Sequence, residues 1–225
     1  MTPESECETP RGFLMQSVRV KDKTIKYVAY VPPTYDPDKP TPCIVFLNGM
    51  GECGTDGLKQ ILVGLGPAVI LNVDKWPFII LFPQKQVTEA DWEDEDDMVM
   101  AIIEKARHDL HLDESRMYLT GLSQGGHGTW SIGAKHPDMW AAIAPICGWG
   151  DEAMAKALVK MPIWVFHGDQ DNAVDIERAR EMAKYLESAG GSCKLTIYAG
   201  VGHNSWDKAY REEKLWEWFM QHRRG

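Results

Sequence analysis

The sequence lacks the features of a disulfide-rich secreted domain and of a membrane protein. Its cysteines are odd in number and widely spaced, and no C-x-x-C pair occurs among Cys7, Cys43, Cys53, Cys147 and Cys193. We therefore expect free thiols in a reducing compartment. No apolar run approaches the roughly 18 residues that a membrane helix needs. The start, MTPESECETPRGF, has no basic stretch followed by an apolar core, so we expect no signal peptide and a cytoplasmic location.

Positive charge is also scarce. The chain has 24 Lys and Arg against 33 Asp and Glu, which gives a formal net charge of −9. Nucleic acids and anionic membranes are bound by basic faces, so we expect neither as a partner. With 225 residues, of which 44% are hydrophobic, the chain can bury a large core. We predict a single domain over residues 1–225, in which residues 1–12 form a flexible N-terminal segment.

Short apolar runs alternate with helical patterns along the chain. Two β-patterned runs, 13–20 and 24–31, flank KDK and predict an antiparallel hairpin. Further runs are continuously apolar, as in strands buried on both faces of a parallel sheet; they cover residues 43–47, 78–82, 116–120, 140–146, 163–166 and 194–198. Helical patterns cover residues 58–71, 94–110, 124–135, 152–159, 175–189 and 206–222. This order predicts an α/β fold with a mostly parallel sheet of about eight strands and helices on both faces.

The stretch TGLSQGGHG, residues 120–128, places Ser123 between Gly121 and Gly125. A predicted strand ends immediately before Gly121, and a predicted helix starts immediately after Ser123. A nucleophile elbow requires this arrangement, because the serine sits in a strained turn that only small residues can flank. The alternative is an ordinary serine in a glycine-rich turn. The strand before it and the helix after it favour the nucleophile.

A serine hydroxyl needs a base to accept its proton. His203 follows the last predicted strand in a glycine-rich loop and precedes the last predicted helix, so we assign it as the general base. His127 lies one helical turn beyond Ser123, and we interpret it as a packing residue, with a substrate contact as the alternative. His167 ends a predicted strand, where it is expected to brace the following loop.

The acid that orients the histidine is expected in HGDQDNAVD, residues 167–175. Asp175 is placed to cap the next helix. Asp169 lies at the strand end, where it can bond the backbone of its own loop. Asp171 lies further out, within reach of His203. We assign Asp171 as the acid and keep Asp169 as the alternative; the order serine, acid, histidine is that of the α/β-hydrolases.

An oxyanion hole needs two converging N–H donors. We assign the backbone amide of Gln124, directly after the serine, and that of Met50, in FLNGMGECG after the first central strand. The glycines of this loop, Gly49, Gly51 and Gly54, also spell G-x-G-x-x-G, so dinucleotide binding is an alternative. It is the weaker one, because the acid expected about 20 residues later, Asp74, precedes a strand instead of ending one.

Four blocks, FLNGMGECG, GLSQGGHGTW, PIWVFHGDQDNAV and YAGVGHNSWDKAY, together resemble the compact phospholipase/carboxylesterase-like serine esterases of the α/β-hydrolase superfamily. These are near the dienelactone hydrolases, acyl-protein thioesterases and feruloyl-esterase-like predicted peptidases. The resemblance extends from Phe13 to the end of the chain and implies the catalytic triad Ser123, Asp171 and His203 with the oxyanion hole named above. The chain departs from the pattern at Asn48, where relatives usually carry histidine, and at His127, where relatives often carry an aromatic residue.

The resemblance implies a carboxylesterase that acts through an acyl-enzyme and needs no cofactor or metal. Between residues 147 and 161 there is room for only one short helix, so we expect no cap domain. An open site of this kind predicts short-chain or aromatic acyl esters, on small molecules or attached to polymers, as substrates. Trp92 and Trp149 follow predicted strands and either bind substrate as walls of its pocket or are partly buried surface side chains.

Other functions remain as alternatives. An acyl-thioesterase or an acyltransferase would use the same triad, and a serine peptidase would need an anchor for peptide termini that the sequence does not display. A metal hydrolase could use the cluster His108, Asp109, His111 and Asp113, although its spacing is not H-x-x-x-H or H-E-x-x-H. A non-catalytic binding module would not require an intact nucleophile, acid and base.

Overall fold

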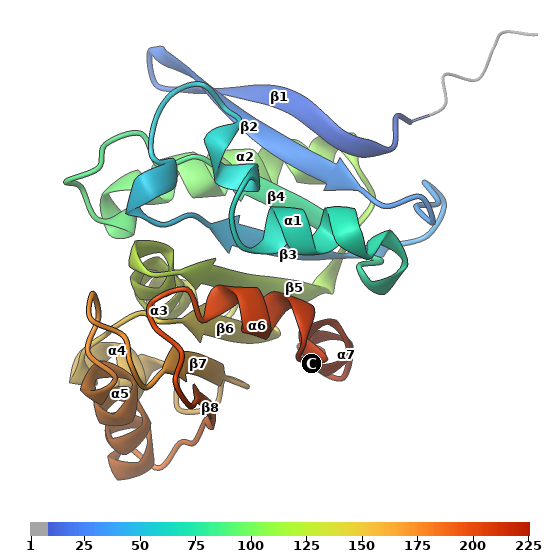
Figure 1. The fold of residues 1–225 in the computed structure, drawn as a ribbon. Coiled ribbons are helices and arrows are strands. Elements are labelled where there is room, and N and C mark those ends of the chain that lie inside the picture. Colours follow the sequence, from blue (N-terminus) through green and yellow to red (C-terminus); the bar gives the residue numbers. More distant parts are fainter. Residues whose placement is uncertain (1–8) are drawn as a thin grey trace, which may run out of the picture.

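A single eight-stranded sheet organises residues 9–225, the part of the chain that the computed structural model describes (Figure 1). The strand order is β1-β2-β4-β3-β5-β6-β7-β8. The first two strands form an antiparallel hairpin, β2 is antiparallel to β4, and all other neighbours are parallel. The strands are β1 (Gly12–Val20), β2 (Lys23–Val31), β3 (Thr41–Leu47), β4 (Ile79–Pro83), β5 (Leu112–Leu122), β6 (Ala142–Ile146), β7 (Trp164–Gly168) and β8 (Lys194–Tyr198).

Helices connect the parallel strands. The α-helices are α1 (Leu65–Leu71), α2 (Asp96–Asp109), α3 (Gln124–Lys135), α4 (Glu152–Ala157), α5 (Glu177–Ser188), α6 (Trp206–Arg211) and α7 (Leu215–Met220). Short 3-10 helices are η1 (Met50–Glu52), η2 (Lys59–Ile61), η3 (Val73–Lys75) and η4 (Trp92–Glu95). The predicted fold class is confirmed. Only α4 lies between β6 and β7, so this connection holds no cap.

Two apolar cores cover the two faces of the sheet, because alternate residues of each strand point to opposite faces. Along β3, Val45 belongs to the core that contains residues of α2, α3, α4 and α5, whereas Phe46 belongs to the core that contains residues of α1, α6 and α7. The central strands are buried on both faces, which explains why their sequences are continuously apolar rather than alternating.

The predicted helix over residues 58–71 is wrong in its extent. Gly64 has a φ of 69° and separates η2 from α1. A side chain here would clash, because a Cβ on Gly64 would lie 2.5 Å from a methyl carbon of Leu122. The glycine therefore lets the chain approach β5 directly before α1 begins.

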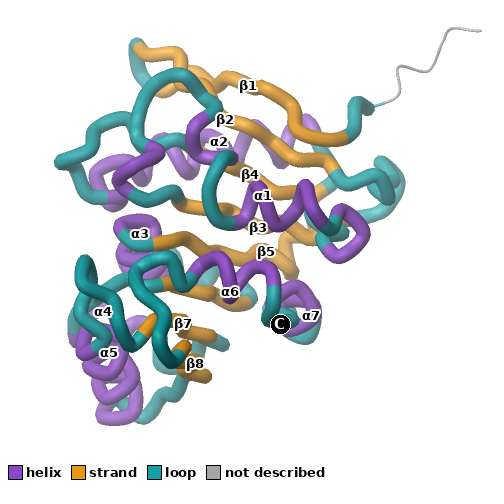
Figure 2. The backbone as a smooth tube through the Cα atoms, in the orientation of Figure 1, coloured by secondary structure: helices purple, strands orange, loops and turns teal. Residues whose placement is uncertain are grey.

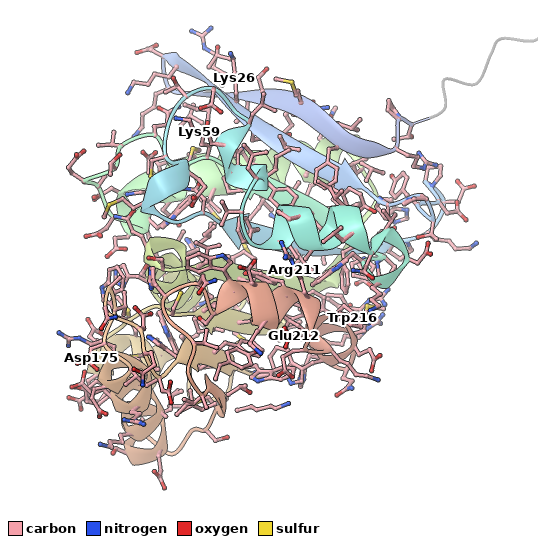
Figure 3. The ribbon with its side chains drawn as sticks, viewed as in Figure 1. Lys26, Lys59, Asp175, Arg211, Glu212 and Trp216 are labelled. Carbon is pink, nitrogen blue, oxygen red and sulfur yellow. The ribbon has the colours of Figure 1, made fainter. Side chains whose placement is uncertain are left out.

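The predicted helix over residues 206–222 is two helices. The carbonyl of Lys208 accepts the amides of both Glu212 and Glu213, at 2.9 and 3.3 Å, and this closes α6. The helix α7 then packs in a new direction, with Trp216 edge-on to Trp76 at 5.9 Å between ring centroids. Figure 3 labels Glu212, which follows the last residue of α6, and Trp216, which lies in α7. Tertiary packing thus interrupts a pattern that reads as one helix.

The predicted flexible segment falls mostly on residues 1–8, outside the described part. Arg11 is fixed by a 2.9 Å hydrogen bond from its guanidinium to the carbonyl of Tyr35, and β1 begins at Gly12. Cys7 also lies outside the described residues, while the remaining four cysteines are free thiols, as predicted. Within residues 9–225 no helix has the length and apolar character to cross a membrane.

Loops at the carboxyl ends of β3, β5, β7 and β8 carry the residues predicted for the catalytic triad and the oxyanion hole, and Trp92 and Trp149 follow β4 and β6. In Figure 2 these loops are teal segments that leave the orange strands. Parallel strands present their carboxyl ends at the same edge of a sheet, so residues as far apart in sequence as Met50 and His203 meet there. This edge is where the site is expected.

We predict that Gly125→Ala destabilises the fold by about 3 kcal/mol. The added methyl group would clash with backbone atoms, which cannot move away from it as a flexible side chain could. A Cβ on Gly125 would lie 2.0 Å from the carbonyl oxygen of Leu47 in the neighbouring strand. Gly51→Ala is the matched control, since its Cβ would meet nothing within 4 Å, and its effect is expected to stay below about 0.5 kcal/mol. Urea unfolding measures both; equal stabilities of the two variants would contradict this account.

Candidate active site

Ser123 occupies a strained turn between β5 and α3. Its φ is 54° and its ψ is −116°, a backbone conformation that residues other than glycine rarely adopt. Such strain costs about 1–3 kcal/mol and persists only where the surroundings enforce it. Here the Ser123 amide is held by the carbonyl of Ile146 at 2.9 Å. Gly121 lies so close to the backbone of Gly125 that a Cβ would be 2.4 Å from its carbonyl oxygen.

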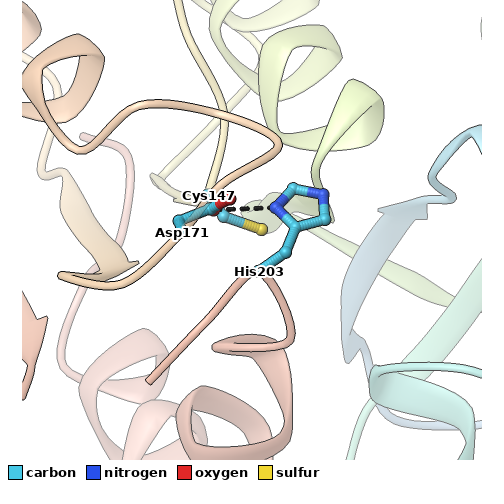
Figure 4. Close-up of side chains that lie close together, drawn as sticks. All are labelled: Cys147, Asp171 and His203. Atoms are coloured by element: carbon cyan, nitrogen blue, oxygen red, sulfur yellow. Dashed lines mark hydrogen bonds and ion pairs between the residues drawn. The ribbon is translucent and has the colours of Figure 1, made fainter. Parts of the chain in front are cut away.

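Three predicted residues from three separate loops form one hydrogen-bonded chain. The Nε2 atom of His203 lies 2.8 Å from the hydroxyl of Ser123, and its Nδ1 atom lies 2.7 Å from a carboxylate oxygen of Asp171. Figure 4 shows the contact between His203 and Asp171. The Asp171 side chain is fully buried and that of His203 is about three-quarters buried, with 26% exposed. This arrangement can move a proton from the hydroxyl to an imidazole whose positive charge faces a carboxylate.

The environment of Asp171 keeps its carboxylate ionised. Burial alone would raise the pKa of Asp171, but hydrogen bonds from His203 and from the amides of Val174 and Ala173 outweigh it, so this pKa lies below the ordinary 3.8. Both amides donate to the same carboxylate oxygen at 2.9 Å. The second oxygen is thereby left for the imidazole.

The other polar residues of this loop serve its shape. His167 is buried, which lowers its pKa, and its Nε2 lies 2.9 Å from the carbonyl of Val174, in agreement with the predicted brace. Asp169 accepts the amide of Gly200 at 2.7 Å and so ties the β7 loop to the loop that bears the histidine. Asp175 accepts the amide of Glu177 at the start of α5. Asp169 therefore binds backbone, and Asp171 binds the imidazole.

Cys147 lies beside the acid and the base and has a φ of 39° (Figure 4). Its sulfur and the ligand atoms of Asp171 and His203 are all within 4.8 Å of one another. Complete burial raises the pKa of the Cys147 thiol to about 12. The thiol is therefore protonated at neutral pH and is a poor nucleophile.

The two amides assigned to the oxyanion hole flank the serine. Met50 and Gln124 line one cavity together with Ser123. Within residues 9–225, neither of these backbone N–H groups donates to another protein group. Gly49 has an extended backbone that leads into η1, and its own amide donates to the carboxylate of Glu52 at 3.1 Å. Two uncommitted donors beside a serine can bind an oxygen that becomes negatively charged.

Asn48 holds the loop that contains Met50. Its side-chain amide donates to the carbonyl of Gly49 at 2.6 Å, and its oxygen accepts the amide of Lys85 at 3.0 Å. The asparagine thus fastens the turn of this loop. The alternative of a dinucleotide site fails here, because the glycine loop enters the three-residue η1 rather than a long helix.

The cavity at this edge has a volume of about 480 Å³. It is lined by Gly49, Met50, Gly51, Glu52, Leu122, Ser123, Gln124, Trp149, Ala173, Val174, His203 and Trp206. Sequence reasoning missed Trp206, whose ring stands edge-on to His203 at 5.3 Å between centroids. Trp206 is the first residue of a predicted helix and follows His203 by three positions. This spacing is the sequence signal that could have predicted its place beside His203.

Of the two tryptophans considered for the substrate pocket, Trp149 lines the cavity and Trp92 does not. Trp149 lines the cavity and stacks on His127, with ring centroids 4.8 Å apart and planes 7° apart. The expectation that Trp92 binds substrate is wrong. Trp92 is fully buried, its indole donates to the carbonyl of Asn48 at 3.1 Å, and it packs against Gly128. It supports the floor beneath the loop instead of walling the cavity.

The cluster considered for a metal hydrolase is dispersed. His108 contacts Asp109 at 2.8 Å, whereas the ring of His111 lies 3.0 Å from the carbonyl of Pro37. Asp113 is paired with Arg116 at 2.6 Å. Each member therefore has a separate structural partner, and the four do not converge on one point.

Comparison with known proteins then identifies the family. The phospholipase/carboxylesterase family model matches residues 75–214. The chain belongs to this family. The solved structure of a thermostable esterase superposes with a TM-score of 0.85 and is 32% identical, covering 94% of this chain and 63% of that one. These findings identify the α/β-hydrolase fold and the phospholipase/carboxylesterase family.

Curated relatives of this carboxylesterase-family chain are more distant. A putative carboxymethylenebutenolidase of Escherichia coli is 26% identical over 134 residues, which are 49% of this chain and 48% of the relative. A bifunctional acetylxylan esterase/xylanase of Neocallimastix patriciarum is 25% identical over 115 residues, 49% of this chain and 17% of the relative. The chain thus spans about half the length, or less, of the curated relatives it matches.

We predict that Asp171→Asn lowers kcat/KM for an ester on the order of 10⁴-fold, because the imidazolium then loses its carboxylate partner. Asp169→Asn is the matched control. Its side-chain oxygen can still accept the amide of Gly200, so we expect a change of less than about threefold. Steady-state kinetics with circular dichroism as a fold check compares the two; a larger loss in Asp169→Asn would assign the acid to Asp169.

The lowered pKa of Asp171 also predicts a pH-dependent stability. A carboxyl group whose pKa is lower in the folded state stabilises it above the unfolded value, here 3.8, and this contribution is lost as pH falls through the folded pKa. The free energy of unfolding of the wild type, relative to that of Asp171→Asn, should therefore decrease below about pH 4. Urea titrations at pH 5 and pH 3 measure this difference, and equal values would contradict it.

Proposed function

We propose that this chain is a serine carboxylesterase that hydrolyses short-chain or aromatic acyl esters through an acyl-enzyme on Ser123. The observation that carries the proposal is the hydrogen-bonded chain of Ser123, His203 and Asp171, with contacts of 2.8 and 2.7 Å, at the wall of a cavity with two unpaired amides. The family assignment supports the same reaction class.

In the proposed reaction, His203 accepts the proton of the Ser123 hydroxyl as its oxygen attacks the ester carbonyl carbon. The carbonyl oxygen becomes an oxyanion and binds the amides of Met50 and Gln124. The bond to the alcohol oxygen then breaks, and this oxygen takes the proton from His203. Water repeats the sequence on the acyl-enzyme, which releases the acid and restores the serine. Asp171 stabilises the imidazolium in both halves of the reaction.

The size and the aromatic lining of the cavity support the proposal that the acyl group of the substrate is small or flat. Its volume of about 480 Å³ is at the lower end of ligand sites, and Trp149 and Trp206 offer aromatic surfaces beside Ser123. The absence of a cap between β6 and β7, where only α4 lies, leaves the alcohol side open to bulky groups. Esters attached to polymers are therefore included among the proposed substrates.

The test compares p-nitrophenyl esters from acetate to dodecanoate and a hydroxycinnamate ester. We expect turnover that is highest for acetate, butyrate or the hydroxycinnamate, and a loss in Ser123→Ala on the order of 10⁴-fold or more. The matched control is Ser131→Ala, which removes another hydroxyl of α3 whose bond to the carbonyl of Gly128 is long, at 3.4 Å. It should keep wild-type activity.

Other outcomes discriminate the alternatives. Folded wild type that cleaves acyl thioesters at least about 100-fold faster than the matching oxygen esters, with the same dependence on Ser123, would support a thioesterase instead. Transfer of the acyl group to an added alcohol faster than to water would support an acyltransferase. Ester turnover that survives Ser123→Ala unchanged would reject the proposed nucleophile.

A further inference from the structure

A second cluster of ligand-bearing side chains lies behind the cavity wall, apart from the serine, acid and base. Asp91 and Glu93 lie at the start of η4, and His127 lies in the first turns of α3. One ligand atom from each of these side chains lies within 4.8 Å of the others. We propose that Asp91, Glu93 and His127 bind one divalent transition-metal ion, of which Zn²⁺ is the representative.

The imidazole of His127 is oriented as a metal ligand. Its Nδ1 atom lies 3.0 Å from the carbonyl oxygen of Trp149, and a carbonyl can only accept, so Nδ1 carries the proton. In the neutral ring, Nε2 then presents its lone pair towards Glu93. A backbone carbonyl commonly fixes metal-binding histidines in this way. The side chain of His127 is only 9% exposed, so its direction is set by the packing.

The carboxylate of Glu93 provides an independent observation. Its Oε2 atom is buried and has no hydrogen-bond partner among residues 9–225. It lies 3.5 Å from Nε2 of His127 without forming a hydrogen bond to it. When the imidazole is neutral, the lone pairs of these two atoms face each other and repel, and a cation between them removes the repulsion. A tetrahedral metal with bonds of about 2.0–2.1 Å has ligand atoms about 3.4 Å apart, close to this separation.

The surrounding charge favours a cation. Six of the seven residues from 91 to 97 are acidic. Asp96 and Asp97 are paired with Lys135 and Lys21, at 2.7 and 2.8 Å. Within residues 9–225, no lysine or arginine forms an ion pair with Asp91 or Glu93. Asp91 and Glu93 therefore share with Asp94 and Glu95 a negative charge that no lysine or arginine of this described part neutralises, and of these four only Asp91 and Glu93 lie together with His127.

The segment that bears the carboxylates is held in place from several sides. The side chain of Gln124 donates to the carbonyls of Thr88 and Ala90, at 3.1 and 3.2 Å, and the ammonium of Lys85 donates to the same two carbonyls. Trp92 anchors the middle of the segment in the core. A ligand set on such a support needs little reorganisation to bind a metal.

The proposed ion would also stiffen one wall of the cavity. His127 stacks on Trp149, and Trp149 lines the cavity. A metal on Nε2 would fasten this pair to the acidic segment. The site is separate from the reacting groups, so it can be tested by metal binding alone.

The experiment is isothermal titration of the metal-free full chain with zinc chloride, with thermal unfolding in the presence and absence of zinc. We expect one ion per chain, a raised Tm, and a Kd that increases at least about tenfold in Glu93→Gln or Asp91→Asn. The matched control is Glu95→Gln, which removes the same charge from the same segment outside the cluster and should bind zinc like the wild type.

Three results would overturn the proposal. An equal loss of affinity in Glu95→Gln and Glu93→Gln would indicate attraction to the acidic segment as a whole. Loss of the ion in His203→Asn would place it beside Cys147, Asp171 and His203 instead. Absence of saturable binding by the folded wild type would leave His127 and Glu93 as an imidazolium–carboxylate pair.

Discussion

The close approach of the turn after β5 to the end of β3 is the constraint on which the rest of the site depends. Gly125 lies against the carbonyl of Leu47 so closely that no side chain fits between them. This contact forces Ser123 into its positive φ and brings the amide of Gln124 beside the loop of Met50. A looser contact would relax the serine backbone and separate the two amides. The glycines thus determine both the strain and the alignment of the donors.

Backbone carbonyls and amides hold most of the polar side chains around this contact. Asn48 binds main-chain groups of the loops after β3 and β4, the ammonium of Lys85 binds carbonyls of the loop after β4, and Asp169 binds the loop after β8. Loops gain order in this way without extended sheet pairing, because these buried side chains find partners on the main chain. Since these partners are backbone groups, the loops can keep their shape while residues that face the cavity change.

Burial divides the titratable groups of this edge into two kinds. Asp171 is buried but receives enough hydrogen bonds to stay ionised, whereas the thiol of Cys147 is buried with too few to favour its charged form. The carboxylate of Glu52 is an intermediate case: burial raises its pKa even though it accepts the amide of Gly49. Hydrogen bonding, rather than depth alone, decides where negative charge is retained beside the serine.

The sequence by itself determined the fold class, the strand–turn–helix around Ser123 and the loops that bear Asp171 and His203. These depend on local signals, namely continuous apolar runs, glycine spacing and chain order. Only the tertiary structure decided the rest. Trp92 is buried and Trp206 lines the cavity, although both follow strands, because burial depends on which elements pack on a loop. The break before α7 and the meeting of Glu93 with His127, 34 positions away, likewise arise from contacts between distant segments, which no local pattern encodes.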